Sequence, residues 1–284
     1  MKFDKTAGHV AYNDKKHIYV NTNNKRRYIS VTTLVHKYVP EFKAAYWSTY
    51  KAVKDVMENK DPDLWYKYKR QAGGWEKVVD YYNKKSSKTN KSLKNAVDLR
   101  AAWYLEQWDR TRDHACELGT AIHNELEGAA YTSQKIREDI VNYDVSQENI
   151  LALQDFTTNR VYPELLIYND EFMVAGQADK VFKHGNVVDI HDYKTCKKID
   201  IEGFRGETLL APFTNIPNAN YWIYTLQLSM YGWMLEQLGY QVRDLKMHWI
   251  YGDDPESDVR DKVKTFDLEY MPTEVEQMMN LNIF

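Results

Sequence analysis

Short strand-like runs on either side of one long helical segment constrain the fold of this chain most strongly. β-Branched and aromatic residues concentrate in five such runs, at residues 164–168, 171–183, 186–195, 245–251 and 262–268. Between the third and fourth runs, residues 221–238 have the apolar spacing of a helix, with Asn220 as N-cap and Gly239 after its end. A short helix should follow Pro272. Strands before and after a helix predict an α/β core.

The N-terminal region is expected to add a hairpin and several helices to this core. Residues 17–31 alternate polar and apolar side chains about a central turn, and a helix should begin at Ser30 or Thr32. Helical spacing recurs over residues 33–60, 62–82, 94–131 and 147–160. We therefore divide the chain into a basic hairpin and helical region, 1–104, and a core, 105–284.

The composition is that of a soluble globular protein. The 284 residues are 43% hydrophobic and 28% charged, with a mean hydropathy of −0.67. Apolar runs are far shorter than the roughly 18 residues of a membrane span, and no signal-like stretch begins the sequence. Cys116 and Cys196 form neither a disulfide framework nor a four-thiolate metal site. We expect a protein that neither spans a membrane nor is secreted.

Charge is divided unevenly along the chain. Residues 1–100 hold 22 Lys and Arg against 10 Asp and Glu, whereas residues 101–284 hold 16 against 31. A basic part attracts polyanions, and an acidic part can hold divalent cations. Alternatively, the uneven distribution of charged residues has no function. Lys84, Lys85 and Lys88 lie in a segment with few apolar residues, which is either a solvated loop or a strap across a nucleic-acid backbone.

A predicted hairpin places two carboxylates opposite each other. With Gly185 and Asn186 as its two-residue turn, Asp179 faces Asp192, and Lys194 returns to the same face two residues later. Like charges so placed are destabilising unless a cation lies between them or one is protonated. The patch is therefore a divalent-cation site with a lysine beside it, or a surface hairpin with an Asp–Lys ion pair. A bulge would shift the register and remove the facing pair.

Four short motifs occur in order, GTAIH at 119–123, GQAD at 176–179, DYKT at 192–195 and QLSMY at 227–231. In these motifs the chain resembles the RecB-type branch of the PD-(D/E)XK nucleases, whose GxxxH, G-x-x-D, D-x-K and QxxxY motifs have the same order. The segment SVTTLVHKY at 30–38 resembles the entry segment of compact phage and mitochondrial exonucleases of that branch. The two cysteines of the chain cannot bind the iron–sulfur cluster of other relatives. The resemblance implies a restriction-endonuclease-like core, a mixed central sheet flanked by helices.

The resemblance also assigns roles to individual residues. His123, Asp179, Asp192 and the backbone carbonyl of Tyr193 would be metal ligands, and Lys194 would be catalytic together with the two aspartates. Gln227 and Tyr231, four residues apart on one helix face, would support the site or contact the DNA backbone. Glu164 corresponds to an upstream acidic residue that can serve a second cation. Asp189 and His191 lie on the opposite face of their strand and are expected to be structural or solvent-facing.

The function implied is that of a Mg²⁺- or Mn²⁺-dependent DNA nuclease. Of the possible activities, an exonuclease acting on single-stranded ends in replication, recombination or repair fits a compact chain with no phosphate-binding motor motif. Its partners would be DNA and proteins of replication or recombination, in the cytoplasm of a bacterial or phage-infected cell. The alternatives are a structure-specific endonuclease and an inactive scaffold that binds DNA ends.

Overall fold

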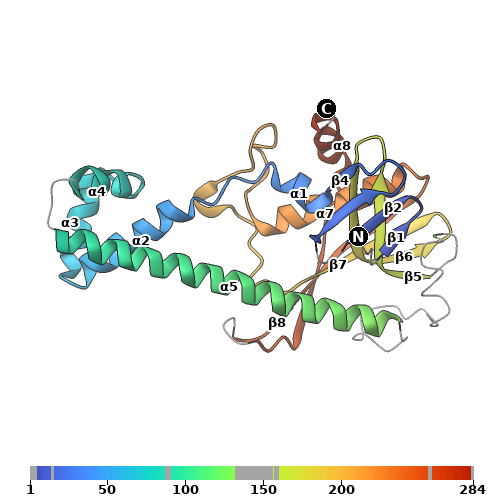
Figure 1. The fold of residues 1–284 in the computed structure, drawn as a ribbon. Coiled ribbons are helices and arrows are strands. Elements are labelled where there is room, and N and C mark those ends of the chain that lie inside the picture. The colour runs from blue at the N-terminus through green and yellow to red at the C-terminus, as the bar shows by residue number, and fades with distance from the viewer. Residues whose placement is uncertain are drawn as a thin grey trace. The chain divides into compact units, whose positions relative to one another are not determined.

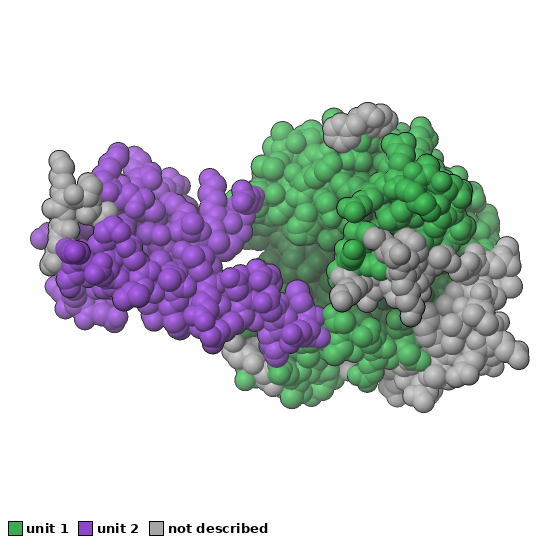
Figure 2. All heavy atoms as spheres, viewed as in Figure 1, with its two compact units in different colours: residues 1–40, 118–284 green, residues 41–117 purple. Residues whose placement is uncertain are grey.

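The computed structural model describes residues 5–13, 16–86, 91–131, 156, 160–254 and 258–282 (Figure 1). Lys88 and most of the helix expected at 147–160 lie outside these residues. The chain divides into two compact units, which we call the sheet unit (residues 1–40 and 118–284) and the helical unit (residues 41–117; Figure 2). No helix in the described ranges is long and apolar enough to cross a membrane.

The centre of the sheet unit consists of the five strands that the sequence predicts. They are β5 (Val161–Asn169), β6 (Val174–His184), β7 (Val187–Lys194), β8 (Gln241–Tyr251) and β9 (Lys262–Asp267). Neighbouring strands are antiparallel except for β7 and β8, which are parallel. A parallel pair needs a long crossover, and the connection contains a short 3₁₀ turn (Phe204–Gly206) and helix α7 (Asn220–Glu236). The expected α/β class is therefore confirmed.

Four N-terminal strands extend this sheet. They are β1 (Lys5–Ala7), β2 (Val10–Asn13), β3 (Ile18–Asn21) and β4 (Arg27–Ser30), joined as an antiparallel meander. The last strand pairs in parallel with β6, through Ile29 and Val174, so the described strands form one nine-stranded sheet. Because of this pairing, the first 40 residues belong to the sheet unit, and the two units do not divide at residue 104.

The main hydrophobic core lies between the sheet and helix α7. Ten of the 17 residues of α7 are buried, which is typical of an interior helix rather than a surface helix with one apolar stripe. Helix α1 (Val31–His36) and helix α8 (Pro272–Leu281) pack against α7. The side chain of Ser30 accepts a hydrogen bond from the amide of Thr33 and caps α1, as the sequence predicts.

The helical unit has a core of its own. It contains α2 (Ala44–Glu58), α3 (Pro62–Ala72), a 3₁₀ turn (Trp75–Lys77), α4 (Val78–Ser86) and the first part of α5 (Lys91–Tyr131). The buried side chains at its centre are Ala52, Val53, Met57, Trp65, Val78, Tyr82 and Val97. Lys84 and Lys85 are exposed in the last turn of α4, just beyond the helical spacing that the sequence shows over residues 62–82.

Candidate metal centre

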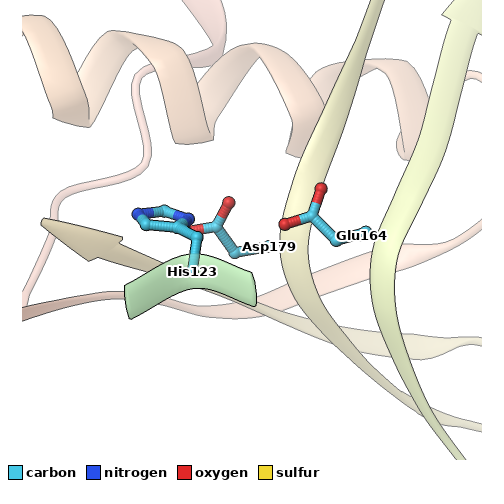
Figure 3. Close-up of side chains that lie close together, drawn as sticks. All are labelled: His123, Glu164 and Asp179. Carbon is cyan, nitrogen blue, oxygen red and sulfur yellow. The ribbon is translucent and has the colours of Figure 1, made fainter. Parts of the chain in front are cut away.

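Three side chains that could hold a metal ion come together in the sheet unit (Figure 3). His123 is in the last part of α5, Glu164 is in β5 and Asp179 is in β6. One ligand atom from each lies within 4.8 Å of the other two, and all three residues are partly buried. Carboxylate oxygens are the donors that Mg²⁺ and Mn²⁺ prefer, and a neutral imidazole adds one nitrogen. The donor set therefore fits a divalent cation.

The Asp179 carboxylate is held by two neighbours. Its Oδ2 accepts a hydrogen bond from the backbone amide of Tyr193 at 2.7 Å and lies 3.4 Å from His123 Nδ1. Burial alone would raise the pKa of Asp179, but the His123 ring, Lys194 and the Tyr193 amide keep that pKa below its usual value. Burial opposes a charge on His123, yet the Asp179 carboxylate raises the pKa of the imidazole to about 9. The pair is thus an ion pair when no metal competes.

Glu164 reaches the cluster through an irregular backbone. Its φ of 49° is in the left-handed region, which a glutamate rarely adopts. On either side the β5–β6 ladder is regular, with Pro163 opposite Lys180 and Leu165 opposite Ala178. The pair that would join Glu164 to Asp179 is missing from that ladder. Backbone strain of this kind concentrates at functional sites, and here it occurs at the residue that completes the donor set.

The hairpin between β6 and β7 has the register that the sequence predicts. Pairs run from His184 with Val187 to Lys180 with His191, so no bulge shifts them. Continued by one residue, the same register places Asp179 opposite Asp192. Gly185 has a φ of 62° and supplies the left-handed turn conformation for which glycine is suited.

Asp192 pairs with Lys194 and lies outside the three-donor cluster. Lys194 Nζ is 2.5 Å from Asp192 Oδ2, and the two side chains are 17% and 3% exposed. Burial and the Asp179 carboxylate raise the pKa of Asp192 to about 6, although Lys194 opposes this shift. Burial would lower the pKa of Lys194, but the two aspartates raise it above its usual value. Lys194 is therefore a partly buried cation beside the candidate metal ligands.

A glycine in α5 lets the helix approach the end of β7. A Cβ on Gly119 would lie 3.2 Å from Thr195 Oγ1, closer than most side chains tolerate. His123 follows one turn later, where its ring meets the Tyr193 ring edge-on with 6.2 Å between centroids. The GxxxH spacing thus has a physical reason. Gly119 lets α5 pack closely against the end of β7, and this packing positions His123.

The QxxxY motif lies in α7, which packs against the sheet. Tyr231 is 3% exposed, is hydrogen-bonded to Gln227 and packs on Gly176, where a Cβ would lie 2.7 Å from its ring. The hydroxyl of Tyr231 is therefore in the interior. Sequence reasoning missed Tyr224, whose ring lies 4.7 Å from Lys194 Nζ. Its signal was its position three residues before Gln227, on the same face of the helix.

The opposite face of β7 is structural. Asp189 is buried and forms an ion pair with Arg243, and His191 is buried with its Nδ1 2.9 Å from His248 Nε2. Of the two predicted alternatives, a structural role and a solvent-facing position, the structure shows the structural role, because the neighbouring strand β8 supplies partners on that face. Burial lowers the pKa of His191 to about 2, so its ring is neutral.

The expected phosphate-binding lysines belong to the helical unit. Lys84 and Lys85 are exposed, and Lys85 Nζ lies 4.7 Å from the centroid of the Tyr81 ring. Lys88 lies outside the described residues. Lys84 and Lys85 therefore belong to the helical unit, and the candidate metal centre belongs to the sheet unit.

No protein-family model matches the sequence, and no curated protein matches it. Among solved structures, the chain is similar to one from Eubacterium rectale described as "Putative exonuclease", with a TM-score of 0.31 and 10% sequence identity. The match covers 90% of this chain and 78% of that chain, a similarity too low to assign a fold or an activity.

Proposed function

We propose that this protein is a DNA nuclease of the RecB-type PD-(D/E)XK kind that depends on Mg²⁺ or Mn²⁺. The observation that supports this most is the convergence of three distant motifs. His123 from a helix and Asp179 from a strand approach within 3.4 Å, with the Asp192–Lys194 pair on the next strand. A partly buried lysine beside a carboxylate-rich cation site suits the metal-assisted hydrolysis of a phosphodiester.

The ligands in this proposal are His123, Asp179 and Asp192 with the Tyr193 carbonyl, and Glu164 completes the site or serves a second ion. When bound, the cation neutralises the scissile phosphate and lowers the pKa of water. To bind it, His123 must lose the proton that Asp179 stabilises, because imidazole ligates metals in its neutral form. Glu164 contributes a further carboxylate, one oxygen of which lies within 4.8 Å of the ligand atoms of His123 and Asp179.

Lys194 would act as a fixed positive charge. Its raised pKa keeps the amine protonated at neutral pH, and Asp192 holds it in place. A protonated amine here donates hydrogen bonds that orient an attacking water and stabilise negative charge developing on the phosphate. Because the group is positioned before the reaction, it needs no rearrangement at the transition state.

The remaining expected roles concern DNA. We propose that Gln227 and Tyr231 support the site from helix α7 and that Lys84, Lys85 and Lys88 contact phosphates of the DNA backbone. The basic region that the sequence defines, residues 1–104, includes parts of both units. We propose that it binds the DNA strand and that the catalytic residues of the region 105–284 cleave it. An exonuclease on single-stranded ends, working with replication or recombination proteins in a bacterial or phage-infected cytoplasm, is the activity we favour.

Digestion of internally labelled DNA tests this function. Linear and covalently closed single-stranded DNA are incubated with the full chain and Mg²⁺, Mn²⁺ or chelator, for the wild type, Lys194→Ala and the control Lys198→Ala. Lys198 pairs with Asp200 and is 73% exposed, so its loss should leave cleavage unchanged. We expect the wild type to degrade linear DNA but not the circle, and only when Mg²⁺ or Mn²⁺ is present. Lys194→Ala should abolish this degradation. Cleavage of the circle would indicate an endonuclease, and normal cleavage by Lys194→Ala would refute the assignment.

A further inference from the structure

A row of aromatic and cationic side chains crosses the surface of the helical unit. We call it the aromatic ridge, and its members are Phe42, Lys51, Arg100, Trp103, Tyr104 and Trp108. Arg100, Tyr104 and Trp108 are four residues apart in α5 and share one face of that helix. Phe42 and Trp103 are 61% and 42% exposed, so the ridge presents ring surface to solvent.

The rings of the ridge contact one another in sequence. Phe42 meets Trp108 with 5.5 Å between ring centroids, Trp108 is 6.0 Å from Tyr104, and Tyr104 is 5.1 Å from Trp103. These separations are within the range of favourable aromatic pairs. The four rings therefore form a continuous surface.

Two cations lie against these rings. Lys51 Nζ is 4.6 Å from the Tyr104 ring centroid, and the Arg100 guanidinium is 4.2 Å from that of Trp103. Asp55 accepts hydrogen bonds from Arg100 at 2.9 Å and from the Tyr104 hydroxyl at 2.5 Å, which fixes both side chains. Lys51 has no ion-pair partner among the described residues. Its charge is thus available to an anion.

The ridge is separate from the hydrophobic core of its own unit. That core is built around Val53, Trp65 and Val78, and neither it nor the apolar side chains packed on it include a ridge residue. Packing of the helical unit therefore does not account for the exposed rings. A contiguous exposed apolar patch of this kind indicates an interaction surface.

We propose that the aromatic ridge binds single-stranded DNA, with its rings stacked on unpaired bases and its cations beside the phosphates. Exposed rings and interleaved cations suit a strand whose bases are open, whereas the bases of a duplex are already stacked. Residues 41–117 carry 16 Lys and Arg against 12 Asp and Glu, a net charge that complements phosphate. The choice of DNA rests on the proposed function, but this binding requires neither metal nor hydrolysis.

The test is equilibrium binding by the full chain in EDTA, where no cleavage can occur. The probe is a fluorescein-labelled oligothymidylate of about 30 nucleotides, longer than a typical single-strand site. Trp103→Ala should weaken binding about 5- to 150-fold, the loss that follows removal of one base-stacking ring, and Trp103→Phe should retain most of the affinity. Lys51→Ala should reduce the slope of log K against log salt by about 0.7.

A matched control comes from the same unit. Tyr66 is 63% exposed, with Lys69 Nζ 5.7 Å from its ring, and it lies outside the ridge, so Tyr66→Ala should bind like the wild type. Equal affinity for the wild type and Trp103→Ala, an equal loss in Tyr66→Ala, or an equal loss on duplex DNA would each overturn the proposal. Ring-dependent binding without any cleavage in Mn²⁺ would contradict only the proposed nuclease activity.

Discussion

Lys180 is a buried cation whose removal should stabilise the protein. Its side chain follows Asp179 in β6 and is 3% exposed, with the Phe182 and Tyr193 rings each 5.7 Å from its Nζ. Burial lowers its pKa from the usual 10.5 to about 8. The difference between these two pKa values corresponds to about 3 kcal/mol, since a pKa difference of one is worth about 1.4 kcal/mol. Replacement by methionine, which is similar in length and uncharged, removes this cost.

The sign of the pH dependence follows from the same shift. Below pH 8 both the folded and the unfolded wild type hold the proton, so the full cost of burying the charge is present. Between about pH 8 and 10.5 the unfolded chain binds more protons than the folded one, and wild-type stability rises with pH. The advantage of Lys180→Met should therefore be about 3 kcal/mol at pH 7 and should shrink as pH approaches 10.5.

Urea denaturation of both proteins at pH 7, 9 and 10 measures this difference. Comparison of the two proteins at each pH cancels the titration of all other groups. A methionine variant that is less stable than the wild type at pH 7, or an advantage that does not change with pH, would refute the reasoning.

Further substitutions test the fit of single residues. Gly176→Ala places a Cβ 2.7 Å from the Tyr231 ring, so overpacking should lower the free energy of unfolding by about 1–3 kcal/mol. An unchanged midpoint in urea denaturation would contradict the close contact between these two residues. Ser30→Ala removes the cap of α1 and should cost about 1 kcal/mol, whereas Ser30→Asp should restore it. Glu164→Gln should weaken Mn²⁺ binding by about tenfold or more in calorimetry, and equal affinity would exclude Glu164 as a ligand.

Local patterns in the sequence predicted the strands and their register well. The two-residue turn at Gly185 and the alternation on either side of it were enough to place Asp179 opposite Asp192, because a hairpin's register follows from its turn. The helix carrying Gln227 and Tyr231 was equally clear from its apolar spacing and from Gly239 after its end. These features depend on residues that are close in the chain.

Features that depend on contacts between residues far apart in the chain were harder to predict from the sequence. The parallel pairing of β4 with β6 joins residues about 145 positions apart, and no local pattern encodes it, so the unit boundaries differ from the expected division. Glu164 reaches the cluster through a left-handed backbone, which periodicity cannot predict for a glutamate. Partners for Asp189 and His191 come from β8, some 50 residues later in the chain.

In the proposed metal centre, His123 and Asp179 hold a divalent cation together with neighbouring carboxylates. Electron paramagnetic resonance of free Mn²⁺ measures this directly when the ion is titrated into the wild type, Asp179→Asn and the control Asp244→Asn, whose carboxylate is exposed beside Arg243. We predict that the wild type and the control bind Mn²⁺ and that Asp179→Asn loses this binding. Equal Mn²⁺ binding by Asp179→Asn and the wild type would contradict the assignment of Asp179 as a metal ligand.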